Sequence, residues 1–158
     1  MASSRRLKLL MGAATLGVAI VATVLACERF FPESYEKTFS NYEAALRHPA
    51  IGPQGPVPLY TPRSAVDIRI RTMVESSASW MSFRAPTTDI ATMVRSCTPV
   101  AENAVEYPRV TPKGWWPRGL SRGEKRGDLH YEYYRCRARA FTAVDPQHGE
   151  VFEWQLDH

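Results

Sequence analysis

The chain has 158 residues, of which 44% are hydrophobic and 23% are charged, and it carries a formal net charge of +4. This composition is that of an ordinary globular protein and excludes a disordered or multi-pass membrane chain. Three of the positive charges, Arg5, Arg6 and Lys8, precede the first acidic residue, Glu28, so the body of the chain carries only +1. A nearly neutral body gives no electrostatic reason to expect a nucleic-acid partner.

The first element in chain order is an apolar segment of 18 uncharged residues from Leu9 to Ala26. A basic cluster, an apolar stretch and a small residue follow one another in the order of an export signal. Because basic residues stay on the cytoplasmic side, the chain after residue 27 is expected to face outwards. Spanning a bilayer takes about 20 residues, so the length alone leaves a retained membrane anchor open.

The residues at the junction, Val24-Leu25-Ala26-Cys27, resemble the lipobox of bacterial lipoproteins. The resemblance implies that the Cys27 thiol receives a diacylglycerol and that residues 1–26 are removed as a signal peptide. It also implies that the new amino terminus is acylated, which makes palmitate an expected modification. Two or three acyl chains hold a protein firmly on a membrane. An uncleaved single-pass anchor is the alternative.

The number of cysteines fits this modification. Three cysteines would leave one unpaired in an oxidising compartment. If Cys27 carries lipid, Cys97 and Cys136 remain as an even pair, and we predict a disulfide between them. Two unlinked buried thiols are the alternative.

Residues 27–63 are expected to form the lipidated N-terminus, an amphipathic helix and a proline-rich linker. Aromatic and aliphatic residues recur at helical spacing, namely Tyr35, Phe39, Tyr42 and Leu46. This spacing predicts a membrane-proximal helix over 33–48, whose stripe contacts lipid or a partner or, as we favour, packs on the domain. The five prolines of residues 49–63 predict an extended connector that wraps the domain or spaces it from the membrane.

Residues 64–158 are expected to fold as one α+β domain. Alternation of apolar and polar residues predicts strands over 65–74, 80–85, 129–141 and 150–156, the last two joined by a turn at 145–149. Thr87 or Thr88 is expected to cap a short helix that reaches Cys97. The sum is a small antiparallel sheet of about four strands with one short helix packed on a face.

The irregular segment 107–127 is the strongest candidate for a binding site. It holds six basic residues against one acidic residue, and it contains adjacent tryptophans. Indole rings supply apolar contact area and cations steer an acidic protein, an envelope component or an anionic membrane surface towards them. Alternatively, the indoles cover the open edge of the core, although adjacent tryptophans cannot easily both point inwards. The candidate residues are Lys113, Trp115, Trp116, Arg118 and Arg122.

Three arginines alternate along the third predicted strand and could bind an anion. We expect instead that they pair with acidic residues across the sheet. The arginines are Arg135, Arg137 and Arg139, and the acidic residues are Glu150, Glu153 and Asp67.

The remaining titratable residues show no spacing typical of catalysis or of a metal site. The histidines, His48, His130, His148 and His158, are scattered and form no HExxH motif. We therefore expect no cofactor, no metal and no enzymatic activity. A small hydrolase stays open as an alternative if His130 and a carboxylate share a deep pocket.

The chain as a whole resembles small uncharacterised lipoproteins of Gram-negative bacteria. The resemblance rests on the lipobox, on "PRSAVDIRI" from Pro62, on "WMSFRAPTTDIATMV" from Trp80 and on "GWWP" from Gly114. It implies a lipid-anchored protein of the cell membrane whose domain faces the periplasm or the exterior. We expect a non-enzymatic lipoprotein that binds a protein or envelope component, with a periplasmic immunity or inhibitor lipoprotein as the alternative.

Overall fold

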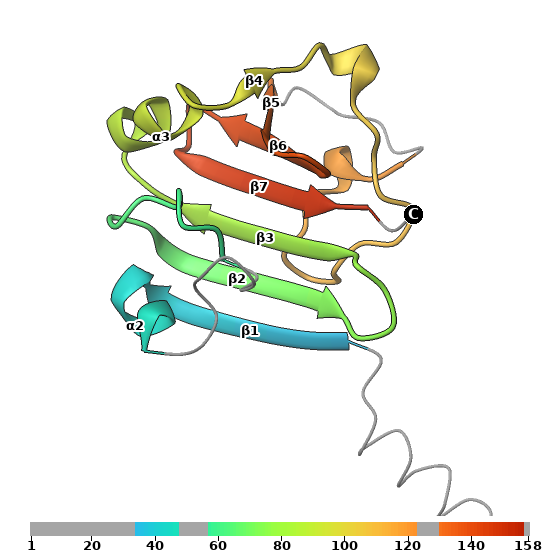
Figure 1. Cartoon of the computed structure of the whole chain (residues 1–158), viewed down its shortest axis with the longest axis horizontal. Helices are drawn as coiled ribbons and strands as arrows, with labels where there is room; N and C mark the ends of the chain where they lie inside the picture. Colours follow the sequence, from blue (N-terminus) through green and yellow to red (C-terminus); the bar gives the residue numbers. More distant parts are fainter. Residues whose placement is uncertain (1–33, 48–56, 123–129, 157–158) are drawn as a thin grey trace, which may run out of the picture. The chain divides into compact units, whose positions relative to one another are not determined.

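The structure is a computed structural model that describes residues 34–47, 57–122 and 130–156. They belong to one compact unit, Ser34–His158. The elements in chain order, shown in Figure 1, are β1 (Ser34–Asn41), α2 (Tyr42–Leu46), β2 (Val66–Met73), β3 (Ser79–Arg84), α3 (Thr87–Val94), β4 (Thr98–Pro99), η1 (Glu102–Ala104), η2 (Arg118–Leu120), β5 (Glu132–Arg137), β6 (Ala140–Asp145) and β7 (Glu150–Gln155). The signal or anchor helix predicted for residues 1–26 lies outside the described residues. Within the described part of the chain, no helix has the length and apolar character needed to cross a membrane.

The seven strands form one sheet in the order β1-β2-β3-β7-β6-β5-β4, and each neighbouring pair is antiparallel. The predicted α+β fold with about four strands is therefore wrong. The domain is built mainly from β-structure, and its helices are short. Two of the additional strands, β1 and β6, arise towards the two ends of the domain, where the sequence patterns misled for different reasons, and the third, β4, has only two residues.

At the N-terminal end, residues 34–41 form an edge strand rather than the first part of the helix predicted over 33–48. β1 pairs with β2 along its whole length. This pairing overrides the helical spacing of the aromatic residues, because propensity and spacing are weak compared with tertiary contacts. The helix begins only after Asn41, whose side-chain oxygen accepts a hydrogen bond from the Ala44 N–H (2.8 Å) and caps the short helix α2.

At the C-terminal end, the strand predicted over 129–141 turns back after β5, so β5 and β6 form a hairpin of their own. The predicted hairpin around 145–149 is confirmed for β6 and β7. The Asp145 carboxylate stabilises its turn, since it accepts hydrogen bonds from the backbone N–H groups of Gln147 (2.9 Å) and His148 (3.1 Å).

Helix α3 occurs where the sequence predicts a helix, but its ends differ. Neither Thr87 nor Thr88 caps it: the N-cap position is Pro86, and no side chain supplies a capping hydrogen bond. The helix ends at Val94, before Cys97. Its apolar face nevertheless packs on the sheet, as the periodicity predicts.

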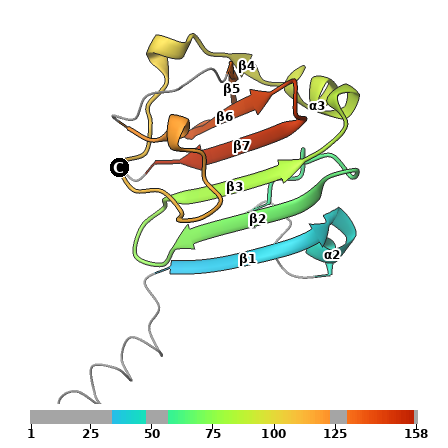
Figure 2. The same cartoon turned by 180° about the vertical axis from the view of Figure 1, so that it is seen from behind.

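The two faces of the sheet are covered by different segments. We call the side covered by α2, α3 and residues 57–65 the helix face, which is seen from the front in Figure 1. The side covered by residues 100–122 is the loop face, which is seen from the front in Figure 2. The connector predicted over 49–63 therefore wraps the domain in its described part, 57–63.

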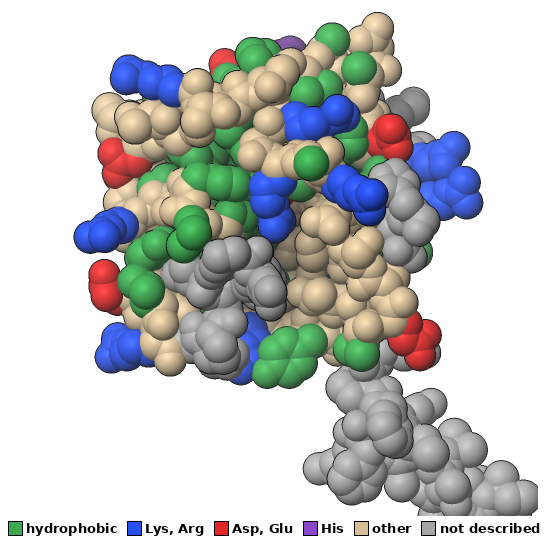
Figure 3. Space-filling model, in the orientation of Figure 1, with side chains coloured by type: hydrophobic (Ala, Val, Ile, Leu, Met, Phe, Trp, Pro, Cys, Tyr) green, Lys and Arg blue, Asp and Glu red, His purple; other side chains and the backbone are tan. Residues whose placement is uncertain are grey.

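The helix face has a mostly aliphatic core. Ile68 and Ile70 of β2 point into it, as their alternation predicts, whereas Val66 is 40% exposed. The reason is a β-bulge in which Asp67 adopts a φ of 51°. Figure 3 shows basic side chains scattered among the hydrophobic ones on this side of the molecule. The core residues are Phe39, Tyr42, Ala45, Val57, Ala65, Ile68, Ile70, Met81, Phe83, Ile90, Met93, Val144 and Val151.

Two of the three cysteines meet in the fold. Cys97 follows α3, Cys136 lies in β5, and their sulfur atoms are 2.08 Å apart. The fold therefore allows the disulfide that the cysteine count predicts. Such a bond closes the segment that covers the loop face. Cys27 lies outside the described residues.

Candidate functional site

The candidate site is built on the segment that covers the loop face, residues 105–122, which we call the Trp loop. The Arg122 N–H donates to the Pro108 carbonyl (3.0 Å), and the Ser121 hydroxyl bonds the Thr111 hydroxyl (3.4 Å). The two ends of the loop are therefore held together, as in a compact Ω-loop. Figure 2 shows it lying across the sheet.

Trp116 anchors the Trp loop to the sheet. Its indole is 7% exposed and packs edge-on against Phe152 (5.7 Å between ring centroids) and Trp154 (6.0 Å). The indole N–H donates to the Leu120 carbonyl (3.2 Å) within the loop. Trp116 therefore belongs to the core, as in the alternative interpretation of the sequence, and its role is to hold the loop in place.

Trp115 fixes the tip of the loop to the edge of the sheet. Its indole N–H donates to a side-chain oxygen of Glu36 in β1 (2.8 Å), and the ring is half-buried against Trp116. One of the two indoles is thus partly exposed, as the sequence predicts. The sequence gives no hint of the Glu36 contact, because that residue was assigned to a helix.

The basic side chains of the Trp loop point into solvent. Lys113, Arg118 and Arg122, together with Arg109, are exposed, and residues 105–122 contain a single acidic residue, Glu106. No ion pair among the described residues involves any of the four cations. No carboxylate in the described part of the chain therefore neutralises their charge. Arg109 was missed among the candidate residues, although its basic neighbours along the chain could have indicated it.

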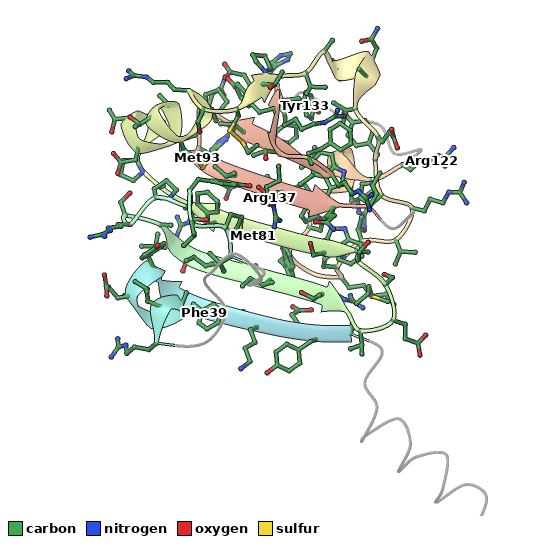
Figure 4. All side chains as sticks on the ribbon, viewed as in Figure 1. Phe39, Met81, Met93, Arg122, Tyr133 and Arg137 are labelled. Carbon is green, nitrogen blue, oxygen red and sulfur yellow. A yellow bond between two sulfur atoms is a disulfide. The ribbon has the colours of Figure 1, made fainter. Side chains whose placement is uncertain are left out.

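A large cavity lies between the base of the Trp loop and one end of β2, β3 and β7. We call it the main groove, and its volume is about 780 Å³. Arg109 and Arg122 both line it, and Figure 4 shows Arg122 beyond the C-terminal end of β7. Burial raises the pKa of Tyr107, which also lines it, so this phenol stays neutral at physiological pH. The apolar lining comes from Met73, Ala78, Trp80, Val105, Tyr107, Val110 and Leu156.

A second cavity of about 430 Å³ lies at the opposite ends of the same strands and contacts Trp115 and Trp116. Its charges are balanced, since two cations and two carboxylates line it and Arg84 is ion-paired with Asp67. The structure thus divides the predicted binding residues. The tryptophans border the balanced cavity, and Arg122 borders the main groove.

The arginines of the third predicted strand do not form one ladder. Arg137 reaches the helix face and pairs with Glu153 (2.5 Å), as predicted, and Figure 4 shows it over the middle of β7. Glu153 is 1% exposed and also accepts hydrogen bonds from Tyr60 and from Thr142 (3.3 Å). Arg135 instead lies over the Phe141 ring, 4.8 Å from its centroid.

Burial, followed by the nearby Glu153 charge, raises the pKa of Tyr60. The pKa of His148 is raised by its hydrogen bond with Asp145. Burial alone would raise the Asp145 pKa, but hydrogen bonds from the His148 ring and from the turn backbone lower it on balance. Both shifts reflect the attraction between the two side chains across the β6–β7 turn, which is strongest when His148 is protonated.

No cluster of three or more His, Cys, Asp or Glu side chains suited to a metal ion occurs in the described ranges. His130 is exposed and lines neither the main groove nor the second cavity.

No protein-family model matches the chain, and no curated protein and no solved structure is significantly similar to it.

Proposed function

We propose that this protein is a non-enzymatic lipoprotein of the cell envelope, held on the membrane by acyl chains on Cys27. Its β domain binds an acidic protein or another acidic envelope component through the exposed tip of the Trp loop. The residues that make the contact are Lys113, Trp115 and Arg118. Arg122, which the sequence groups with them, borders the main groove instead.

The observation that supports this proposal is the contrast within the Trp loop between buried anchors and exposed cations. Trp116 and the backbone bond from Arg122 to Pro108 hold the loop on the sheet, while Lys113 and Arg118 extend into solvent. A surface that is ordered before binding loses less conformational entropy when a partner arrives. Exposed cations that form no ion pair with a described residue also raise the association rate with an acidic partner.

The docking proposal is tested by quantitative capture of partners from solubilised envelopes. The test variant is Lys113→Gln/Arg118→Gln, and the matched control is Arg63→Gln/Arg95→Gln, which removes two exposed cations elsewhere. We expect the test variant to lose the partner that the native protein and the control retain. Trp116→Ala is unsuitable, because removing a buried anchor disturbs the fold itself. Equal retention by all three proteins would contradict the proposal.

The anchor is tested separately by mass spectrometry of the purified native protein and of Cys27→Ala. We expect the native product to begin at residue 27 and to carry the mass of the acyl groups. Cys27→Ala should keep residues 1–26 and carry no lipid. A native product that retains an unmodified leader would contradict the anchor without bearing on the docking surface.

A further inference from the structure

The main groove has the form of a site for a small molecule rather than of a gap in packing. Its volume of about 780 Å³ lies within the range of ligand sites, roughly 300–1,000 Å³. Most of the lining is apolar, and Trp80 and Tyr107 supply aromatic surface. Val110 on its wall is 65% exposed and offers further apolar surface to a ligand.

Two arginine residues border this apolar surface. The backbone hydrogen bond from Arg122 to Pro108 brings Arg122 next to Arg109, and both residues line the groove. Among the described residues that line the groove, Glu106 is the one acidic residue, so these residues together carry a net charge of +1. Guanidinium groups bind planar or tetrahedral oxyanions through paired hydrogen bonds.

We propose that the main groove binds a small amphipathic anion, in which an apolar ring or chain carries one carboxylate, phosphate or sulfonate group. The two arginines bind the anionic group, and the aromatic and aliphatic lining covers the apolar part. A net charge of +1 suits one anionic group better than a polyphosphate, and a cationic ligand is disfavoured. Sites of this volume enclose most of a small molecule, which favours a free molecule over a headgroup that stays in a bilayer.

This inference goes beyond the proposed function and does not depend on it. Docking of the acidic partner uses Lys113 and Arg118 at the tip of the Trp loop, whereas the groove uses Arg109 and Arg122 at its base. Each pair can be removed without the other, and all four side chains are exposed, so neither double variant should unfold the protein.

The test is calorimetric titration of the protein, as purified from membranes with whatever N-terminus it carries, in phosphatidylcholine nanodiscs, with empty nanodiscs subtracted. Two anions are compared with their neutral counterparts: naphthalene-1-sulfonate with naphthalene-1-methanol, and octanoate with 1-octanol. We expect at least one anion to bind saturably and more tightly than its counterpart. Arg109→Gln/Arg122→Gln should weaken the affinity for that anion by about tenfold or more, as expected when charge-assisted hydrogen bonds are lost. Binding of the neutral counterpart should be unchanged.

The matched control is Lys113→Gln/Arg118→Gln, which removes the same charge from the same loop and should leave the anion's affinity unchanged. Val110→Asp adds a carboxylate to the wall of the groove and should weaken anion binding in particular. Equal losses in both double variants would show a general charge effect and overturn the proposal. So would the absence of saturable binding by either anion. Loss of partner capture in the control, with anion binding intact, would separate the groove from the docking surface.

Discussion

The two faces of the sheet are covered by different kinds of segment and different kinds of side chain. The helix face is covered by short regular elements over aliphatic side chains, and its buried carboxylate, Glu153, has Arg137, Tyr60 and Thr142 as partners. The loop face is covered by an irregular segment that is held by aromatic side chains. Cavities remain beside that segment, and its cations are exposed. One face thus mainly stabilises the domain, and we propose that the other presents the binding surfaces.

The largest effect is expected from the disulfide, because it closes the segment that covers the loop face. Cys97 and Cys136 are 39 residues apart, and a closed loop of that length contributes about 4 kcal/mol to the free energy of unfolding. Cys97→Ala/Cys136→Ala should lose this amount in denaturant titrations of the oxidised protein. A reducing agent should lower the native stability similarly and leave the double variant unchanged. If reduction has no effect on the native protein, the cysteines are unlinked thiols.

The next effect concerns the buried charge of the helix face. Arg137→Ala leaves the Glu153 carboxylate, which is 1% exposed, without its cation. We expect a loss of about 3 kcal/mol in the free energy of unfolding, at the lower end of the range for broken buried pairs because the arginine is partly solvated. The matched variant Arg135→Ala removes an exposed cation from the Phe141 ring and should cost about 0.5–1 kcal/mol. Equal losses would contradict the distinction between the faces.

Two glycines with positive φ allow a turn at the sheet to be compared with the tip of the Trp loop. Gly149 has a φ of 66°, and an added Cβ would lie 2.7 Å from the Ala85 carbonyl oxygen. Gly114 has a φ of 91° with open space around it. Gly149→Ala should therefore lower the free energy of unfolding by about 2–3 kcal/mol, because the backbone strain and the clash with the Ala85 carbonyl add. Gly114→Ala should cost only about 1 kcal/mol. Thermal unfolding of both variants measures the difference, and a larger cost at Gly114 would contradict the open geometry.

The smallest effect is a pH dependence on the helix face. Burial and the Glu153 charge raise the folded-state pKa of Tyr60. The contribution of Tyr60 to the free energy of unfolding is therefore complete below its unfolded-state pKa of about 10. This contribution is lost as the pH rises from there towards the folded-state pKa. Tyr60→Phe should lower the free energy of unfolding by about 1.5 kcal/mol at pH 8, the value of a hydrogen bond to a charged acceptor. The cost should shrink by roughly 1.4 kcal/mol at pH 11. A cost that grows with pH would contradict the assigned direction, and Tyr35→Phe at the exposed edge is the control.

The sequence predicts the buried residues best where a regular helix packs on regular strands. Ile68 and Ile70 alternate along β2, and Ile90 and Met93 follow helical spacing in α3, so their burial could be predicted from periodicity. The pairing of Arg137 with an acidic residue across the sheet was also predictable. The Asn41 cap, which marks the real start of α2, was a signal in the sequence that helical spacing outweighed.

The loop face could not be predicted in the same way, because its contacts join residues with no common period. Trp115 meets Glu36, and Trp116 meets Phe152, through the folding of an irregular segment. The composition of the segment identified the candidate residues, but only the fold separates Arg122 from the tip of the loop and brings it beside Arg109. Short strands such as β4, with two residues, also leave no periodic pattern.

The account depends most on the Trp loop being an ordered part of the domain, and amide hydrogen exchange of its backbone measures this directly. The N–H groups of Leu120, Ser121 and Arg122 donate to the carbonyls of Pro117 (3.1 Å), Arg118 (3.0 Å) and Pro108 (3.0 Å), respectively. We predict that these three amides exchange about 100-fold or more slowly than in an unstructured peptide, as expected for hydrogen bonds that open only with a cooperative unit. Exchange at the rate of an unstructured peptide would mean that the loop is not held on the sheet, and both the docking surface and the main groove would lose their basis.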